Sequence, residues 1–119
     1  MGGIKSYTDL EIYKEGYKIT LDLYKITRKY PEEERYEMVS QIRRAAYSIP
    51  LNIAEGWGRK SKLEFKRFLK MSLGSNNELQ VLIEMSKDLG YIEEKEYRDI
   101  KERIERLGKK IYTLEEKWE

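Results

Sequence analysis

Apolar side chains recur along the chain at intervals of three and four residues, which places them on one face of an α-helix. Proline, glycine and capping residues interrupt this pattern, and it predicts four helices over residues 9–30, 33–57, 62–89 and 94–118. Helices joined by such short connections favour antiparallel neighbours. The sequence therefore predicts an all-α fold, an antiparallel four-helix bundle that forms a single domain over residues 1–119.

The second predicted helix contains an internal proline, Pro50. Apolar residues from Val39 to Trp57 keep one helical phase on both sides of it. Proline has no N–H for the carbonyl of Ala46, so it kinks or ends a helix. Because the phase is continuous, we expect one helix kinked at Pro50; a break at Ser48 is the alternative.

Acidic and hydroxyl residues mark the expected helix starts. Thr8 with Glu11, and Ser61 with Glu64, fit the capping box, in which the hydroxyl accepts an N–H of the first turn. The second helix is expected to begin among the glutamates at 32–34, because negative charge stabilises a helix N-terminus.

Glycine and asparagine positions add further expectations. Gly56 and Gly58 should release the chain into a turn, and Gly90 should adopt a left-handed conformation that ends the third helix. Gly74 lies inside that helix, where a close approach of another helix would explain it. Asn76, on the core side, is expected to be a buried hydrogen-bonding residue that fixes the register.

The first predicted helix carries two apolar stripes, although a bundle helix needs only one. One stripe holds Leu10, Tyr13, Tyr17, Leu21 and Tyr24, and its tyrosines have the spacing of a core rim. The second stripe predicts contact with another subunit. The expected interface combines it with the reverse side of the second helix and comprises Ile12, Ile19, Leu23, Ile26, Arg44, Ser48, Leu51 and Glu55.

The chain has no cysteine and no histidine, which excludes thiol and imidazole catalysis, disulfides and the usual zinc sites. Glu55 is a lone carboxylate without a catalytic partner. We therefore predict a protein that is not an enzyme and uses no cofactor or metal. No apolar run is long enough to span a membrane, and no signal peptide is evident, so we expect a cytoplasmic protein with no membrane partner.

Positive charge is concentrated in one segment, although the whole chain carries a net charge of only +2. Residues 40–70 hold eight cations against two carboxylates, whereas the neighbouring segments on both sides are acidic. Such a segment can follow a nucleic-acid backbone by charge alone. Alternatives are a solvated face or an acidic protein partner. The candidate nucleic-acid-binding residues are Arg43, Arg44, Arg59, Lys60, Lys62, Lys66, Arg67 and Lys70.

Three of these cations, Lys62, Lys66 and Lys70, follow each other at four-residue intervals and share one helix side, which we call the lysine row. No aromatic residue stacks among these lysines, so specific readout of a single strand is not predicted.

The stretch Ser40–Arg59, SQIRRAAYSIPLNIAEGWGR, resembles the signature of the four-helix bundle proteins encoded in intervening sequences of 23S rRNA genes. The resemblance continues in both directions, through Tyr13–Tyr24, Ser61–Phe68, Leu73-Gly74-Ser75, Glu78-Leu79 and Leu89-Gly90-Tyr91. It implies a helical bundle whose biochemical role is poorly defined. A related bundle is the accessory protein of diversity-generating retroelements, a pentamer that partners a reverse transcriptase and nucleic acid. The resemblance thus implies a homo-oligomer, with a pentamer as the expected state.

These observations predict a non-enzymatic, oligomeric binding or scaffolding protein that contacts RNA or DNA through its basic segment. The alternative is a protein-only adaptor that docks another protein and binds no nucleic acid. Salt-sensitive binding to nucleic acid distinguishes the two functions.

Overall fold

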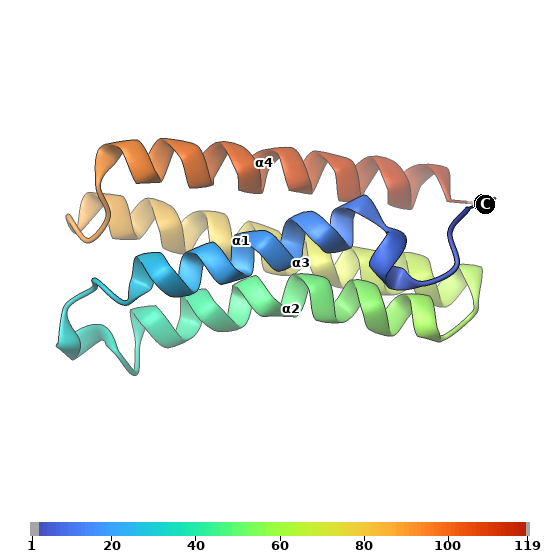
Figure 1. Cartoon of the computed structure of the whole chain (residues 1–119), viewed down its shortest axis with the longest axis horizontal. Coiled ribbons are helices and arrows are strands. Elements are labelled where there is room, and N and C mark those ends of the chain that lie inside the picture. Colours follow the sequence, from blue (N-terminus) through green and yellow to red (C-terminus); the bar gives the residue numbers. More distant parts are fainter. Residues whose placement is uncertain (1–2, 119) are drawn as a thin grey trace.

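The computed structural model describes residues 3–118 of the chain. Short 3-10 helices, η1 and η2, precede the first two of four α-helices. The elements are η1 (Tyr7–Asp9), α1 (Glu11–Thr27), η2 (Glu32–Glu34), α2 (Met38–Gly58), α3 (Lys62–Asp88) and α4 (Glu94–Lys117). Successive helices run antiparallel (Figure 1). The predicted all-α four-helix bundle is confirmed.

Each long helix packs against two others, since α1 and α3 both contact α2 and α4. The bundle measures 45 × 24 × 20 Å. The α2–α3 turn lies at the same end of the long axis as the C-terminus and the N-terminal segment (Figure 1). None of the helices described is both long and apolar enough to cross a membrane.

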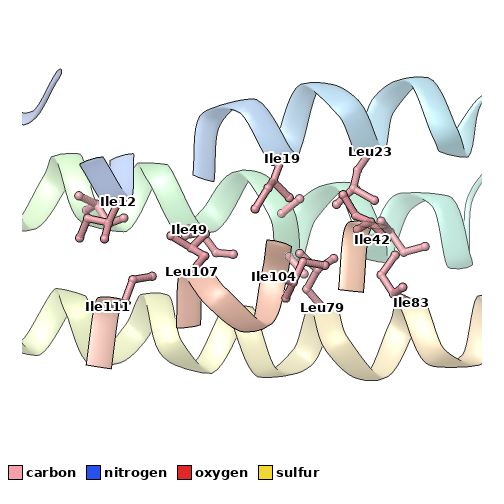
Figure 2. Packing of buried hydrophobic residues seen from close by; sticks show 14 of the residues in the cluster. Ile12, Ile19, Leu23, Ile42, Ile49, Leu79, Ile83, Ile104, Leu107 and Ile111 are labelled. Carbon is pink, nitrogen blue, oxygen red and sulfur yellow. The ribbon is translucent and has the colours of Figure 1, made fainter. Parts of the chain in front are cut away.

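All four helices supply aliphatic side chains to one core, in which these chains point toward each other between the helices (Figure 2). Complete burial of one such side chain contributes about 1.5–3 kcal/mol. The core residues labelled in Figure 2 are Ile12, Ile19, Leu23, Ile42, Ile49, Leu79, Ile83, Ile104, Leu107 and Ile111.

The first helix begins differently from the expectation. The hydroxyl of Ser6, not that of Thr8, acts as the cap: it accepts the N–H of Thr8 at 3.1 Å, and the Asp9 carboxylate accepts the N–H of Ser6 at 3.2 Å. The chain then extends through Leu10 before α1 begins. The predicted Thr8 capping box is wrong, because Asp9 completes a box with Ser6 first. Helix α1 also ends at Thr27, earlier than predicted.

The glutamates at 32–34 form η2 rather than the first turn of α2, which begins at Met38. Glu37 separates the two elements with non-helical angles, φ −119° and ψ −94°. Glu34 still stabilises the helix start, since its Oε1 accepts the backbone N–H of Met38 at 3.3 Å. The predicted boundary is therefore wrong, although a glutamate does cap this N-terminus.

Helix α2 passes through Pro50 without a break, as the continuous apolar phase predicted. The position is buried, and α1 approaches it closely at Gly16. A Cβ added at Gly16 would lie 3.2 Å from Cγ2 of Ile49 and 3.5 Å from Cδ of Pro50. The single helix is confirmed, and the kink stays a prediction.

The two stripes of α1 have the opposite roles from those expected. Ile12, Ile19 and Leu23 are buried inside the chain's own core, and Ile26 packs against it half-buried. In the other stripe, Tyr17 and Leu21 are exposed, whereas Leu10 is buried in the core. The interface assigned to the isoleucine stripe is corrected on this ground, because α2 and α4 of the same chain already cover it.

At the ends of α3 the predicted hydroxyl cap and left-handed glycine are confirmed, whereas the Glu64 carboxylate accepts from Arg67 and does not complete the predicted capping box with Ser61. The Ser61 hydroxyl accepts the N–H of Glu64 at 3.2 Å, and Gly90 is left-handed with φ +78°. The N–H groups of Gly90 and Tyr91 then bond to the carbonyls of Lys87 and Ser86.

Inside α3, the two predictions have different outcomes. No atom of another helix that the structure describes lies within 4 Å of a Cβ added at Gly74, so the predicted close helix contact there is wrong. Asn76 is only 1% exposed and donates from Nδ2 to the carbonyl of Ile104 on α4 at 3.2 Å. Its burial and hydrogen bonding across the helix pair are confirmed.

Candidate nucleic-acid interface

The turn between α2 and α3 positions the basic residues. Helix α2 ends at Gly58, Arg59 is still helical, and Lys60 reverses the chain with φ +54°. Lys60 is the only described residue other than glycine with a positive φ. Gly56 and Gly58 lie within α2 instead of forming the turn, which corrects the expectation.

Gly56 allows α3 to approach the end of α2. A Cβ added there would lie 2.6 Å from Cβ of Phe68, so any side chain would push the helices apart. Beside this contact, the rings of Trp57, Phe65 and Trp118 meet edge to face with centroids 4.7 to 6.1 Å apart. This cluster joins the ends of α2 and α4 to the start of α3 and holds the basic turn in place.

The lysine row runs along α3 from this turn and spans about 12 Å of helix axis. Lys62 and Lys70 are exposed, and Lys66 is half-buried. Among the described residues, no carboxylate pairs with Lys60, Lys62 or Lys66, whereas Lys70 Nζ lies 3.7 Å from Glu115 Oε1. Lys60 in the turn and Lys62 and Lys66 at the start of α3 thus pair with no carboxylate in the part of the chain that the structure describes.

The two arginines of this region are engaged with glutamates. Arg67 donates two hydrogen bonds to Glu64, both 3.2 Å long, and this contact lowers the pKa of Glu64 and raises that of Arg67. Arg59 donates to Glu55 at 3.0 Å. Both guanidinium groups also lie over the Phe68 ring. They frame the turn, but they are less available than the lysines.

Arg43 has a structural position, and this removes it from the candidate site. Its Nε donates to Thr27 Oγ1 at 3.0 Å, a terminal nitrogen donates to the Tyr24 carbonyl at 3.2 Å, and its guanidinium covers the Tyr24 ring. A cation at the C-terminal end of α1 complements the negative end of the helix dipole. Sequence reasoning missed this role because the partners lie on another helix.

Arg44 lies apart from the turn as well, about 22 Å along α2 from Arg59. It contacts Gln41 on its own helix and lies 3.8 Å from Glu78 of α3. The structure therefore brings together Arg59, Lys60, Lys62, Lys66, Arg67 and Lys70, and it separates Arg43 and Arg44 from them.

The remaining residues of the predicted interface have different surroundings. The Ser48 hydroxyl bonds to Ser75 and to the Ala45 carbonyl, and Glu55 accepts from Arg59. Leu51 is 60% exposed. Among the α2 residues of the predicted interface, Leu51 is the one that presents apolar surface to solvent.

Leu51 belongs to an apolar groove between α1 and α2 that sequence reasoning did not locate. The groove has a volume of about 410 Å³ and is lined by Tyr7, Tyr13, Tyr17, Thr20, Leu21, Tyr47, Pro50, Leu51 and Ala54. We call it the tyrosine groove. The sequence signal for it is the tyrosine stripe of the first helix, but spacing alone does not determine which of two apolar stripes faces the core.

Comparisons with known protein families, curated proteins and solved structures place this chain among its relatives. Residues 8–113 match the 23S rRNA-intervening sequence protein family. The chain belongs to this family. No curated protein gave a significant match.

The fold of this 23S rRNA-intervening sequence family member is also found in a crystal structure. That structure is of a protein of unknown function from the S23 ribosomal protein family of Bacteroides thetaiotaomicron. It is 21% identical, with a TM-score of 0.81, and the match covers 88% of this chain and 95% of the other. At this identity the likeness establishes the shared fold.

Within residues 3–118, no group of three acidic side chains converges in a way that could hold a metal ion. The features described above are fixed positive charge beside an aromatic cluster and, separately, the tyrosine groove.

Proposed function

We propose that this family member is a non-enzymatic, self-associating scaffold that contacts the backbone of RNA or DNA through the α2–α3 turn and the lysine row. The observation that carries the proposal is the set of cations at one end of the bundle that pair with no described carboxylate, Lys60, Lys62 and Lys66. Phosphate groups are the partners that such an array attracts, and the attraction needs no base recognition.

The backbone of Lys60 supports this function. Placing the backbone of a non-glycine residue in the left-handed region costs about 1–2 kcal/mol of folding free energy, and glycine would avoid this cost. Lysine nonetheless occupies φ +54° at the tip of the turn. Strained residues of this kind gather at functional sites, and here the side chain supplies a solvent-exposed charge.

The tyrosine groove is the surface we propose for self-association, with a second copy of the chain as its occupant. Tyr17, Leu21 and Leu51 are each at least half exposed, so the groove leaves a contiguous apolar patch on a single chain. The resemblance to a pentameric accessory protein supports a ring of copies. A ring would repeat the basic turn in every subunit, and weak phosphate contacts would reinforce one another.

The same groove favours the second candidate function, a protein-only adaptor. An apolar surface rich in tyrosine is typical of protein contacts and needs no nucleic acid. In that case the lysine row is a solvated face, and the groove alone carries the function.

The test is a fluorescence-anisotropy titration of RNA and DNA oligonucleotides with the wild type and the Lys62→Glu/Lys66→Glu variant. A glutamate at position 62, in the first turn of α3, suits the helix dipole, and neither lysine belongs to the buried core, so this variant should fold. The matched control is Lys14→Glu/Lys18→Glu, which changes the same charge at the same spacing on exposed positions of α1.

We expect the α3 variant to lose binding and the α1 variant to retain most of it. Equal loss in both variants would mean that net charge alone determines binding. Absence of binding by the wild type at low salt would refute the nucleic-acid function and favour the protein-only adaptor.

A further inference from the structure

A second groove lies between α3 and α4, directly beyond the lysine row. It has a volume of about 690 Å³, and its lining includes Leu73, Asn77 and Gln80 from α3 and Gly108 and Tyr112 from α4. Its lining is more polar than that of the tyrosine groove, since it includes amide, hydroxyl and charged side chains beside apolar surface. We call it the amide groove.

The floor of the amide groove is fixed by hydrogen bonds. Asn76 donates to the Ile104 carbonyl at 3.2 Å, and its Oδ1 accepts from Gln80 Nε2 at 3.0 Å. Gly108 keeps the space above it open, because an added Cβ would lie 2.8 Å from Asn76 Oδ1. The polar groups at this floor are therefore held in place before any ligand arrives.

Other polar groups of the groove have no partner in the described part of the chain. Neither the side-chain amide of Asn77 nor the hydroxyl of Tyr112 makes a hydrogen bond there, and the Oε1 of Gln80 makes none either. The Tyr112 side chain is 57% exposed and makes no ring contact with another described aromatic residue. The groove thus offers one aromatic ring, two amides and an open space between them.

The groove continues the lysine row. Lys70 lies 3.7 Å from Glu115 across the two helices, which places this pair at the same level of the bundle. Leu73 follows Lys70 by about one helical turn on α3, and Tyr112 precedes Glu115 by about one turn on the antiparallel α4. A nucleic-acid strand that follows the lysine row and continues along α3 would therefore reach Tyr112 next.

We propose that the amide groove accepts an unpaired nucleobase of a single-stranded nucleic acid whose phosphates lie on the lysine row. Tyr112 stacks on the base, and the amides of Asn77 and Gln80 bond to its edge, as Asn and Gln side chains do with adenine. Glu105 at the far end of the groove accepts from exocyclic amino groups.

This inference rests on the proposed nucleic-acid contact and adds a preference to it. If the protein contacted only phosphates, it would bind a duplex at least as tightly as a single strand, because the charge density of the nucleic acid governs such contacts. A base in a duplex is stacked and paired, so it cannot enter the groove. The groove therefore predicts a preference for single strands, which the lysine row alone would not produce.

The test compares one fluorescent adenine-rich oligonucleotide as a single strand and as a duplex, at one salt concentration. The variants are Tyr112→Leu, which removes the aromatic ring, and Tyr112→Phe, which keeps it. The control is Tyr36→Leu, at an even more exposed tyrosine at the opposite end of the bundle. Both tyrosines are surface residues, so the variants should fold.

The wild type should bind the single strand more tightly than the duplex. Tyr112→Leu should weaken single-strand binding by roughly 5- to 150-fold while leaving duplex binding unchanged, and Tyr112→Phe and Tyr36→Leu should bind like the wild type. Binding that is equal in wild type and Tyr112→Leu would overturn the amide groove and leave the proposed function intact. No binding of either oligonucleotide by the wild type would overturn both.

Discussion

Asn76 on α3 and Gly108 on α4 form a matched pair across the bundle. The Asn76 amide is buried between the helices with both ends hydrogen-bonded, and an added Cβ at Gly108 would lie 2.8 Å from its Oδ1. Replacing a glycine inside a helix by alanine normally raises the free energy of unfolding by about 1 kcal/mol. We expect Gly108→Ala to forfeit that gain and to be neutral or destabilising, measured as the free energy of unfolding in urea.

The double variant isolates the cause. In an Asn76→Ala background the obstructing amide is gone, so Gly108→Ala should stabilise, with a coupling of at least about 1 kcal/mol between the sites. Gly74→Ala is the control for helix propensity, since no described atom of another helix lies within 4 Å of its added Cβ, and it should stabilise by about 0.5–1 kcal/mol. A stabilising Gly108→Ala in the wild-type background would contradict the account.

Local signals in the sequence were sufficient for much of the fold. The apolar period predicted the extents of α3 and α4 to within a residue, and the Ser61 cap and the left-handed Gly90 were found from local chemistry. The starts of α1 and α2 were not, because 3-10 turns precede both and share the same capping residues. The role of Gly56 depends on Phe68 of another helix, and no local pattern encodes that contact.

Arg43 should contribute to stability and not to nucleic-acid binding. Its guanidinium bonds both the Thr27 hydroxyl and the Tyr24 carbonyl at the end of α1. Charged hydrogen bonds of this kind contribute about 1.5–3 kcal/mol, so Arg43→Ala should lower the free energy of unfolding by that order. Its affinity for oligonucleotides should equal that of the wild type at a temperature where both are folded. A large loss of affinity in Arg43→Ala would show that Arg43 belongs to the nucleic-acid-binding site after all.

The candidate site was only partly predictable for a related reason. The lysine row follows from four-residue spacing on one helix, and the structure keeps it together. The separation of Arg43 and Arg44 from it depends on the path of α2 and on partners in α1 and α3. The amide groove requires residues of two helices to face each other, which periodicity within either helix does not specify.

Tyr91 should make stability fall at alkaline pH. Its hydroxyl donates to Glu34 at 2.6 Å, and this bond, with burial and the charge of Glu34, raises the pKa of Tyr91 to about 12. Between its ordinary pKa of about 10 and this value, the unfolded chain loses the proton while the folded chain keeps it. Stability must therefore decrease over that window.

The variant Tyr91→Phe keeps the ring against Tyr30 and removes the titrating group. Chemical denaturation at a series of pH values should show a smaller decrease for the variant than for the wild type between about pH 10 and 12. Below that window the difference between the two proteins should be constant. Parallel curves throughout the alkaline range would show that Tyr91 is not the group responsible.

Self-association should depend on the tyrosine groove. Leu51 lies in the groove and Val81 lies on α3, and both are 60% exposed. Burying a carboxylate in an apolar contact is strongly unfavourable, so Leu51→Asp should give a folded monomer in sedimentation-velocity runs. Val81→Asp should keep the wild-type state. A wild type that sediments as a monomer at micromolar concentrations would refute the proposed interface.

The salt dependence of nucleic-acid affinity tests the central claim most directly. If the lysine row binds phosphates, the logarithm of the association constant should fall linearly with the logarithm of salt concentration. For a single-stranded oligonucleotide, Lys62→Glu/Lys66→Glu should reduce the steepness of that line by about 0.7 for each phosphate that the variant no longer neutralises, and Lys14→Glu/Lys18→Glu should leave it nearly unchanged. An affinity that does not change with salt, or the same slope in all three proteins, would contradict the account.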